Sequence, residues 1–373
     1  MNATAALAED GGRVRMTWPD GASHEVGARW LFDHADEARD PISGQRGHGA
    51  MALEAAAGLE SAEIEGLRLK LRFSPSGVER HIALSRLRVS LDPKRPPIAP
   101  WLTPEPIADA PPVSFQAYLG DDQALREVLS RVAQFGLAVI VGAGPEPGVV
   151  ERTVERFGFV RETNYGRLFD VRIEADPGNL AYTDQALDLH TDNPYRDPVP
   201  TLQLLHAITT DADGGETLFV DAFAHAEALR GEAPEAFEIL ARTPVRFSFA
   251  EASGARWSFE APVLSVGVNG AIEAVRLNHR SLDIAPGDPA PLEAWYDAYL
   301  ALYRRIHAPE AAFARRLAPG EMVIFDNRRL VHGRRAMASA SPRWLQGCYA
   351  DMDGLAATLA RLDRAAAPEP VDA

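Results

Sequence analysis

The chain has 373 residues, of which 46% are hydrophobic and 24% are charged. Its formal net charge of −15 repels nucleic-acid phosphates, which excludes nucleic acid as an expected partner. The single cysteine, Cys348, excludes an intramolecular disulfide, a cysteine-based zinc site and an iron–sulfur cluster. The N-terminal residues lack the features of a signal peptide, and the most apolar window, residues 137–144, is too short to span a bilayer. We therefore expect a cytoplasmic protein that does not bind membranes.

Residues 1–92 are predicted to form a small β-rich domain. Its strand-like runs are residues 13–18, 67–74 and 76–91. Asp20-Gly21 is a typical hairpin turn. In the second run, leucines at alternate positions from Leu67 to Leu71 are separated by basic residues, which is the period of a half-buried strand. A helical piece is expected near residues 49–58.

Eight prolines lie between Asp92 and Val113. Such density is incompatible with regular structure and stiffens the chain, so residues 93–113 are predicted to be a linker between two domains. The final residues, 366–373, are predicted to be a disordered tail.

Residues 114–365 are predicted to form the larger domain. Helices are expected over residues 122–134, around residues 147–157 and over residues 291–306, and a buried strand over residues 137–143. Further strands are expected at residues 201–208, 215–222, 245–249, 273–279, 320–327 and 344–351. Many short strands with few helices predict a mainly β (α+β) fold, with a sandwich or jelly roll as the core.

A metal site is predicted from three residues. His190 and Asp192 are two positions apart, so on an extended strand both side chains point to the same face. His332 follows a strand-like run and precedes a glycine, which makes it the candidate third ligand. Two histidines and one carboxylate form the facial triad of non-haem Fe(II) oxygenases. Taken separately, the His-Thr-Asp triplet also fits a loop with an Asx turn, and His332 a helix C-cap or a buried hydrogen-bonding residue.

Oxygenases of this type use 2-oxoglutarate, whose far carboxylate needs an anchor. Arg343 lies eleven residues after His332 on the next predicted strand and offers a bidentate fork. Thr217 can supply a hydroxyl to the same carboxylate. Two alternatives remain open: a hydrolase with zinc on the same three residues, which needs neither Arg343 nor Thr217, and a binding protein of the same fold without catalysis.

Several motifs together resemble the taurine dioxygenase-like superfamily, and within it the γ-butyrobetaine and trimethyllysine hydroxylases. They are His190-Thr191-Asp192, Gly214-Gly215-Glu216-Thr217, Phe325-Asp326-Asn327, His332-Gly333-Arg334-Arg335 and Arg343 with Tyr349-Ala350-Asp351. The resemblance implies a double-stranded β-helix (jelly-roll) core and a homodimer. It implies Fe(II) held by His190, Asp192 and His332, 2-oxoglutarate held by Arg343 and Thr217, and O₂ as the oxidant.

The resemblance fails at one structural feature of the small domain. Relatives often carry zinc there on three cysteines and a histidine, whereas the corresponding stretch of this chain contains no cysteine. His81 resembles the histidine ligand but is left without cysteine partners. We therefore expect no structural zinc.

The resemblance also implies a substrate with a trimethylammonium group, held in an aromatic box by cation–π attraction. The residues that match box positions are Tyr165, Phe169, Tyr182 and Tyr349.

At the anionic end of this zwitterionic substrate, Asn179 matches a family asparagine, Asn193 replaces a tyrosine, and Arg280 stands where another asparagine is expected. If residues 273–280 are extended, Arg276, Asn278 and Arg280 share one face. An added arginine favours an anion with more charge than a carboxylate, such as a phosphonate. The preferred substrate is therefore 2-(trimethylammonio)ethylphosphonate, hydroxylated at the carbon next to phosphorus. The alternatives are γ-butyrobetaine as substrate and Arg280 as a solvent-exposed residue at a strand end.

Overall fold

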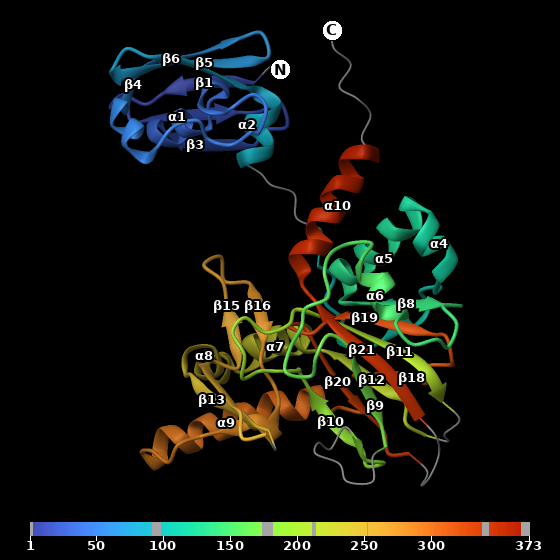
Figure 1. The fold of residues 1–373 in the computed structure, drawn as a ribbon. Helices are drawn as coiled ribbons and strands as arrows, with labels where there is room; N and C mark the ends of the chain where they lie inside the picture. The colour runs from blue at the N-terminus through green and yellow to red at the C-terminus, as the bar shows by residue number, and fades with distance from the viewer. Residues whose placement is uncertain are drawn as a thin grey trace. The chain divides into compact units, whose positions relative to one another are not determined.

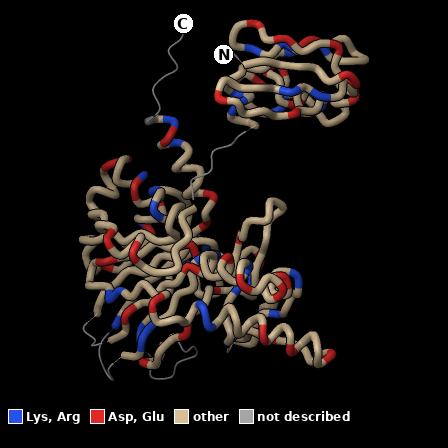
Figure 2. The backbone as a smooth tube through the Cα atoms, turned by 180° about the vertical axis from the view of Figure 1, so that it is seen from behind, with Lys and Arg blue, Asp and Glu red and all other residues tan. Residues whose placement is uncertain are grey.

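The computed structural model describes residues 3–91, 98–173, 182–210, 214–251, 253–337 and 343–366. The predicted tail falls almost entirely outside these residues, and so does the start of the predicted linker. Contacts between residues divide the chain into two compact units, Met1–Arg95 and Pro96–Ala373, which are blue and green-to-red in Figure 1. No described helix is long and apolar enough to cross a membrane. Figure 2 shows acidic and basic residues interspersed along both units.

The N-terminal unit contains two antiparallel sheets of three strands each. Their strands are β1 (Thr4–Leu7), β2 (Arg13–Thr17) and β3 (Ser23–Gly27), then β4 (Ala56–Glu65), β5 (Arg68–Pro75) and β6 (Glu79–Ala83). Alternate side chains of β2 and β5, such as Val14, Leu69 and Leu71, are buried together with residues of helix α1 (Ala28–His34). Leu67 precedes β5 and is exposed, so the buried leucines begin at Leu69.

Three expectations about this unit can be compared with the structure. The Asp20-Gly21 turn joins β2 to β3, with Gly21 at a φ of 86° that favours glycine. The expected helical piece is a 3₁₀ helix, η2 (Ala50–Ala55). The second half of the run 76–91 was expected to be strand-like, which is wrong, because it forms helix α2 (Leu84–Leu91) with Leu87 buried.

The C-terminal unit is built around two facing sheets. The six-stranded sheet has the order β7 (Val113–Ser114), β8 (Leu137–Val141), β19 (Met322–Asp326), β11 (Leu202–Thr210), β21 (Arg343–Ala350) and β9 (Phe169–Arg172). The four-stranded sheet has the order β10 (Leu187–His190), β20 (Leu330–Arg334), β12 (Thr217–Asp221) and β18 (Phe313–Arg315). Successive strands from β18 to β21 alternate between the two sheets, which is consistent with a double-stranded β-helix. Side chains of both sheets meet between them, where the rings of Phe219 and Phe325 lie 5.0 Å apart.

Helices cover the outer faces of these sheets (Figure 1). Those packed on the six-stranded sheet are α4 (Phe115–Gly120), α5 (Asp122–Phe135), α6 (Val149–Val154) and α10 (Met352–Ala366). Those packed near the four-stranded sheet are α7 (Ala222–Glu232), α8 (Pro234–Arg242) and α9 (Pro289–Ile306). They share a core with β13 (Val245–Ala250), β14 (Arg256–Ala261), β15 (Leu264–Val266), β16 (Ile272–Val275) and β17 (Leu282–Asp283). The fold is therefore mixed α/β with many strands, and richer in helix than the mainly β expectation.

The additional helices have local physical causes. Helix α7 follows β12 directly, and the Asp221 side chain caps it by accepting hydrogen bonds from the backbone N–H groups of Phe223 and Ala224. Helix α3 (Glu105–Ala108) interrupts the segment that was expected to lack regular structure. That segment is also anchored, because Trp101 is buried and its indole N–H donates to the carbonyl of Phe135 at 2.9 Å. Proline at the first turn of a helix is tolerated, which is why proline density did not exclude α3.

Candidate metal centre and its cleft

Two histidines meet across the pair β10 and β20. His190 ends β10 and lies directly opposite His332 in the antiparallel register, with ring centroids 4.4 Å apart. Between these strands a side chain at Gly333 would lie 2.6 Å from the carbonyl oxygen of Leu187, so glycine permits their close approach. Cross-strand neighbours point to the same face of a sheet. The pairing therefore presents both imidazoles to one cleft.

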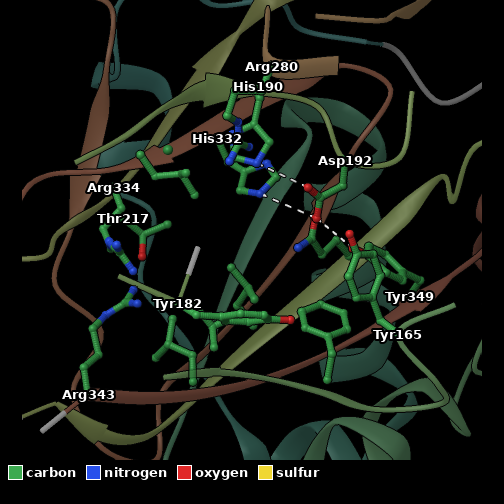
Figure 3. A pocket seen from close by; sticks show the side chains of 17 residues that line it. Tyr165, Tyr182, His190, Asp192, Thr217, Arg280, His332, Arg334, Arg343 and Tyr349 are labelled. Carbon is green, nitrogen blue, oxygen red and sulfur yellow. Dashed lines mark hydrogen bonds and ion pairs between the residues drawn. The ribbon is translucent and has the colours of Figure 1, made fainter. Parts of the chain in front are cut away.

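Asp192 follows β10 and completes the group. Its Oδ1 lies 3.2 Å from Nε2 of His190, and its Oδ2 lies 3.9 Å from Nε2 of His332. One potential ligand atom from each of the three residues lies within 4.8 Å of the others. Figure 3 shows the three side chains facing one another. The structure thus brings together the three residues predicted to bind metal.

The surrounding hydrogen bonds orient these side chains. Nδ1 of His190 lies 2.7 Å from the carbonyl oxygen of Asp188, and a proton donated there leaves Nε2 free to bind a metal. The backbone N–H of Asp192 donates to Oδ1 of Asn327 at 2.7 Å, and Nδ2 of Asn327 donates back to the Asp192 carbonyl at 3.1 Å. This reciprocal pair fixes the segment that carries Asp192.

The protonation states of Asp192 and His332 favour metal binding at neutral pH. Burial opposes the charge of Asp192, but the hydrogen bond from His190 and the nearby histidines outweigh it, and the pKa of this carboxyl is well below its usual range. Burial first, and the neighbouring His190 second, lower the pKa of His332 to about 3. An ionised Asp192 carboxylate and a neutral His332 imidazole are the forms in which these side chains bind a divalent first-row metal, and they fit Fe(II).

A cationic region lies at the other end of the same cleft. Arg343 and Thr217 both line it and are 8% and 4% exposed. Arg334 lies beside them, and burial followed by the charge of Arg334 lowers the pKa of Arg343 to about 9. Among the described residues, no carboxylate forms an ion pair with Arg343. A buried cation without a partner is unfavourable, so this region is suited to an anionic ligand.

All four predicted box residues line the cleft. The rings of Tyr165 and Phe169 lie 6.4 Å apart, and those of Phe169 and Tyr349 lie 4.9 Å apart. Tyr182 lines the same cleft, and Figure 3 shows its ring between the arginines and Tyr165. These four residues form an aromatic wall of the cleft, and the three candidate metal ligands face the same space.

Of the three residues predicted to bind the anionic end of the substrate, only Arg280 is among the described residues that line the cleft. Arg280 lines the cleft from a 3₁₀ turn at His279–Ser281 and is exposed. Asn193 is not among the lining residues. It has a φ of 55°, and its Oδ1 accepts a 2.8 Å hydrogen bond from the Tyr195 hydroxyl. Asn179 lies outside the described residues.

The expected common face of Arg276, Asn278 and Arg280 is wrong. Strand β16 ends at Val275, so alternation no longer applies beyond it. Arg276 instead donates to the carbonyls of Pro194 and Arg196, and Asn278 donates to the carbonyl of Thr191.

In the N-terminal unit, His81 resembles a zinc ligand of the relatives. Its Nδ1 lies 2.8 Å from Oε1 of Glu37.

Two polar residues that line the cleft, Arg334 and Gln203, were not predicted as site residues. Arg334 donates to the carbonyls of Thr183 and Gln185 at 2.6 and 2.7 Å, and thereby holds the segment next to Tyr182. It lies two residues after His332 on β20, so alternation along that strand indicates it. Gln203 is a polar residue within the apolar run of β11, which is the signal that distinguishes it.

Comparison with known proteins places this geometry in a family. A model described as "Taurine catabolism dioxygenase TauD, TfdA family" matches residues 96–349. A gamma-butyrobetaine dioxygenase from Pseudomonas sp. (strain AK-1) is 40% identical over 249 residues, which cover 66% of this chain and 65% of that protein. The mitochondrial trimethyllysine dioxygenase of Bos taurus is 33% identical over 253 residues, which cover 66% of this chain and 59% of that protein. The matched region thus spans less than two thirds of either relative.

Among solved structures, PvcB, an Fe, alpha-ketoglutarate dependent oxygenase, aligns with 24% identity and a TM-score of 0.47 over 64% of this chain and 82% of that chain. The family match and the His–Asp–His group support Fe(II), 2-oxoglutarate and O₂ as the cofactors expected from the sequence. The chain belongs to the taurine catabolism dioxygenase TauD, TfdA family.

Proposed function

We propose that this protein hydroxylates a small trimethylammonium compound with an anionic group at its other end, using Fe(II), 2-oxoglutarate and O₂. The observation that carries the proposal is the shared cleft. It joins the His–Asp–His group, the buried Arg343, which has no carboxylate partner among the described residues, and four aromatic rings. A zinc hydrolase needs the first of these features but neither of the others.

The reaction balances as substrate plus 2-oxoglutarate plus O₂ giving hydroxylated substrate, succinate and CO₂. Bound Fe(II) supplies the activation of O₂. His190, Asp192 and His332 hold the metal. Arg343 and Thr217 bind the far carboxylate of 2-oxoglutarate and fix its orientation. The aromatic wall places the substrate, so the chain contributes mainly positioning and exclusion of water.

The aromatic wall suits a quaternary ammonium group. Such a cation is weakly hydrated and is attracted to ring faces, whereas an ordinary ammonium group needs hydrogen-bond acceptors. Two of the tyrosine hydroxyls in this wall already have partners: that of Tyr349 donates to Asp192, and that of Tyr165 is bonded to the Tyr195 hydroxyl. Arg280 lines the same cleft and is available to bind the anionic end.

We place γ-butyrobetaine first among candidate substrates, because the 40% identical relative is named for it. We place 2-(trimethylammonio)ethylphosphonate second. Arg280 favours it, since a guanidinium group binds a tetrahedral dianion well. Asn193 no longer supports it, because its side chain bonds Tyr195 and does not line the cleft.

The proposal is tested by supplying purified Fe(II) protein and 2-oxoglutarate with γ-butyrobetaine, trimethyllysine or 2-(trimethylammonio)ethylphosphonate. Succinate and hydroxylated product are then measured together. We expect equal amounts of both, with the highest kcat/KM for γ-butyrobetaine. A higher value for the phosphonate would reverse the order of the two candidates. If none of the three compounds stimulated succinate formation, the proposal would be wrong.

A further inference from the structure

Gln203 is a buried amide to which the proposed function gives no role. It lies on β11, in the interior of the six-stranded sheet, and is 2% exposed. Its neighbours Leu202 and Leu204 belong to the hydrophobic cluster on the helix-covered face. Gln203 and Leu205 point the other way and line the cleft. A polar side chain on such a strand requires a hydrogen-bonding partner.

The partner of Gln203 is missing from the described part of the chain. Its side-chain oxygen Oε1 is shielded from solvent and makes no hydrogen bond to a described residue. The oxygen and nitrogen of an amide exchange positions by a 180° flip, so the side chain can offer either group to the cleft. A ligand in the cleft is therefore the natural partner.

The strand register places Gln203 at the metal end of the cleft. Its cross-strand neighbours are Phe325 on one side and Tyr349 on the other. The ring of Phe325 lies 4.9 Å from the ring of His332, and the Tyr349 hydroxyl donates to Asp192 at 2.8 Å. Gln203 thus lies between Phe325, whose ring is close to His332, and Tyr349, which bonds Asp192.

The paired strands β11 and β21 also lead from Gln203 to the cationic end of the cleft, where Arg343 lies. Along β21 the residues facing the cleft run from Tyr349, opposite Gln203, through Leu345 to Arg343, which lies opposite Thr210. Leu205 lines the middle of this path on β11. The path offers an amide, then apolar side chains, then a guanidinium group. 2-Oxoglutarate has a matching order: a keto acid, two methylene groups and a carboxylate.

We propose that Gln203 is a binding residue for 2-oxoglutarate and donates a hydrogen bond to the carboxylate of its keto-acid end. This inference rests on the proposed function, because it requires 2-oxoglutarate to lie between Arg343 and the metal. The amide would fix the rotation of the keto acid about the metal, while Arg343 fixes the far end.

The test uses Gln203→Met and a matched control, Gln346→Met. Gln346 is also a buried glutamine of the same sheet, but its hydrogen bonds are made within the protein: it accepts from the Gly148 N–H at 2.6 Å and donates to Asp170 at 3.0 Å. The dissociation constants of Fe(II) and of 2-oxoglutarate are measured anaerobically, and the Tm is measured on the metal-free proteins. None of these readouts depends on turnover.

We expect Gln203→Met to weaken 2-oxoglutarate binding at least about 10-fold, since the lost hydrogen bond is to a charged group. Its Fe(II) affinity and Tm should match those of the wild type. Gln346→Met should show the reverse, with a lower Tm and unchanged 2-oxoglutarate affinity. Gln203→Glu retains the shape, places a carboxylate against the ligand and should weaken binding further, which provides a second variant if Gln203→Met does not fold.

Unchanged 2-oxoglutarate affinity in both Gln203 variants, with normal binding by the wild type, would overturn the inference and leave the proposed function intact. A weaker Fe(II) affinity that accounts for the whole loss would also overturn it. If the wild-type Fe(II) protein failed to bind 2-oxoglutarate, the proposed function itself would be wrong.

Discussion

The hydroxyl of Tyr349 donates a 2.8 Å hydrogen bond to Oδ2 of Asp192. Tyr349 belongs to the aromatic wall of the cleft, and Asp192 belongs to the metal-binding group. One residue of β21 therefore both lines the cleft and bonds the carboxylate of Asp192. Burial and the nearby Asp192 charge raise the pKa of the Tyr349 hydroxyl far above its usual value, so it remains a donor at every physiological pH.

Tyr349→Phe should weaken metal binding. The variant keeps the ring and removes the donor to Asp192, and loss of a hydrogen bond to a metal ligand typically costs about 10- to 100-fold in affinity. We expect an Fe(II) dissociation constant about 10-fold higher, measured by titration of the metal-free protein under anaerobic conditions. Tyr165→Phe, which removes a hydroxyl bonded to Tyr195 at 3.3 Å, serves as the control and should leave Fe(II) affinity unchanged. Equal affinities in wild type and Tyr349→Phe would show that the hydrogen bond does not matter for the metal.

Arg343 and Arg280 should affect different ligands. Arg343→Lys loses the bidentate fork, so we expect the KM for 2-oxoglutarate to rise about 10- to 100-fold. The KM for the trimethylammonium substrate should change little. Arg280→Lys should raise the KM of the substrate and leave that of 2-oxoglutarate unchanged. Arg335→Lys is the control, because Arg335 is exposed and does not line the cleft. A rise in the KM for 2-oxoglutarate with Arg280→Lys alone would mean that the two anion sites are assigned the wrong way round.

The aromatic wall should bind the substrate through ring faces. We expect Tyr165→Leu to raise the substrate KM about 3- to 30-fold, the range that corresponds to a cation–π contribution of roughly 0.5–2 kcal/mol. Tyr165→Phe keeps the ring face and should have a much smaller effect. The comparison is made by steady-state kinetics at saturating 2-oxoglutarate. If both variants behaved alike, the hydroxyl rather than the ring would be the important group.

His307 gives the structure a pH-dependent contribution to stability. Its Nε2 lies 2.7 Å from Oδ1 of Asp188. Burial alone would lower the pKa of His307, but the hydrogen bonds to Asp188 and to the Tyr303 carbonyl outweigh burial, and the net pKa is raised. The stabilisation is therefore fully present below the unfolded-state pKa of about 6.5 and is lost as the pH rises through the raised folded-state pKa.

The measurement is urea unfolding of metal-free wild type and His307→Gln at about pH 5.5 and about pH 9. The Asp188 side chain is 44% exposed, so we expect a destabilisation of roughly 0–1 kcal/mol at the lower pH. It should shrink toward zero at the higher pH. A destabilisation that stayed constant between the two values would mean that packing, and not the charge of His307, is responsible.

The metal-binding group was predictable because part of its signal is local. His190 and Asp192 are two residues apart, and His332 follows a clear strand. The sequence did not show why His332 meets them, which depends on the antiparallel register of β10 and β20. Arg343 and Thr217 were predicted through chemistry and resemblance, and the structure brings both into the same cleft.

The unpredicted parts depend on backbone geometry that residue patterns do not specify. Asn193 was assigned to the substrate by its position after the metal-binding triplet. Its left-handed backbone, with a φ of 55°, directs the side chain to Tyr195 instead. Likewise, the early end of β16 removes Arg276 from the face expected for it. The alanine-rich helix α7 follows β12 without a turn, so the change from strand to helix period was not recognised.

The most direct test of the proposed chemistry is the ratio of succinate to hydroxylated substrate for the Fe(II) protein supplied with γ-butyrobetaine and 2-oxoglutarate. We expect a ratio close to one, no product when Zn(II) replaces Fe(II), and no product from His190→Ala, which lacks one of the metal-binding side chains. Conversion of the substrate without consumption of 2-oxoglutarate, or undiminished conversion with Zn(II) or by His190→Ala, would contradict the assignment of this cleft as an Fe(II) and 2-oxoglutarate site.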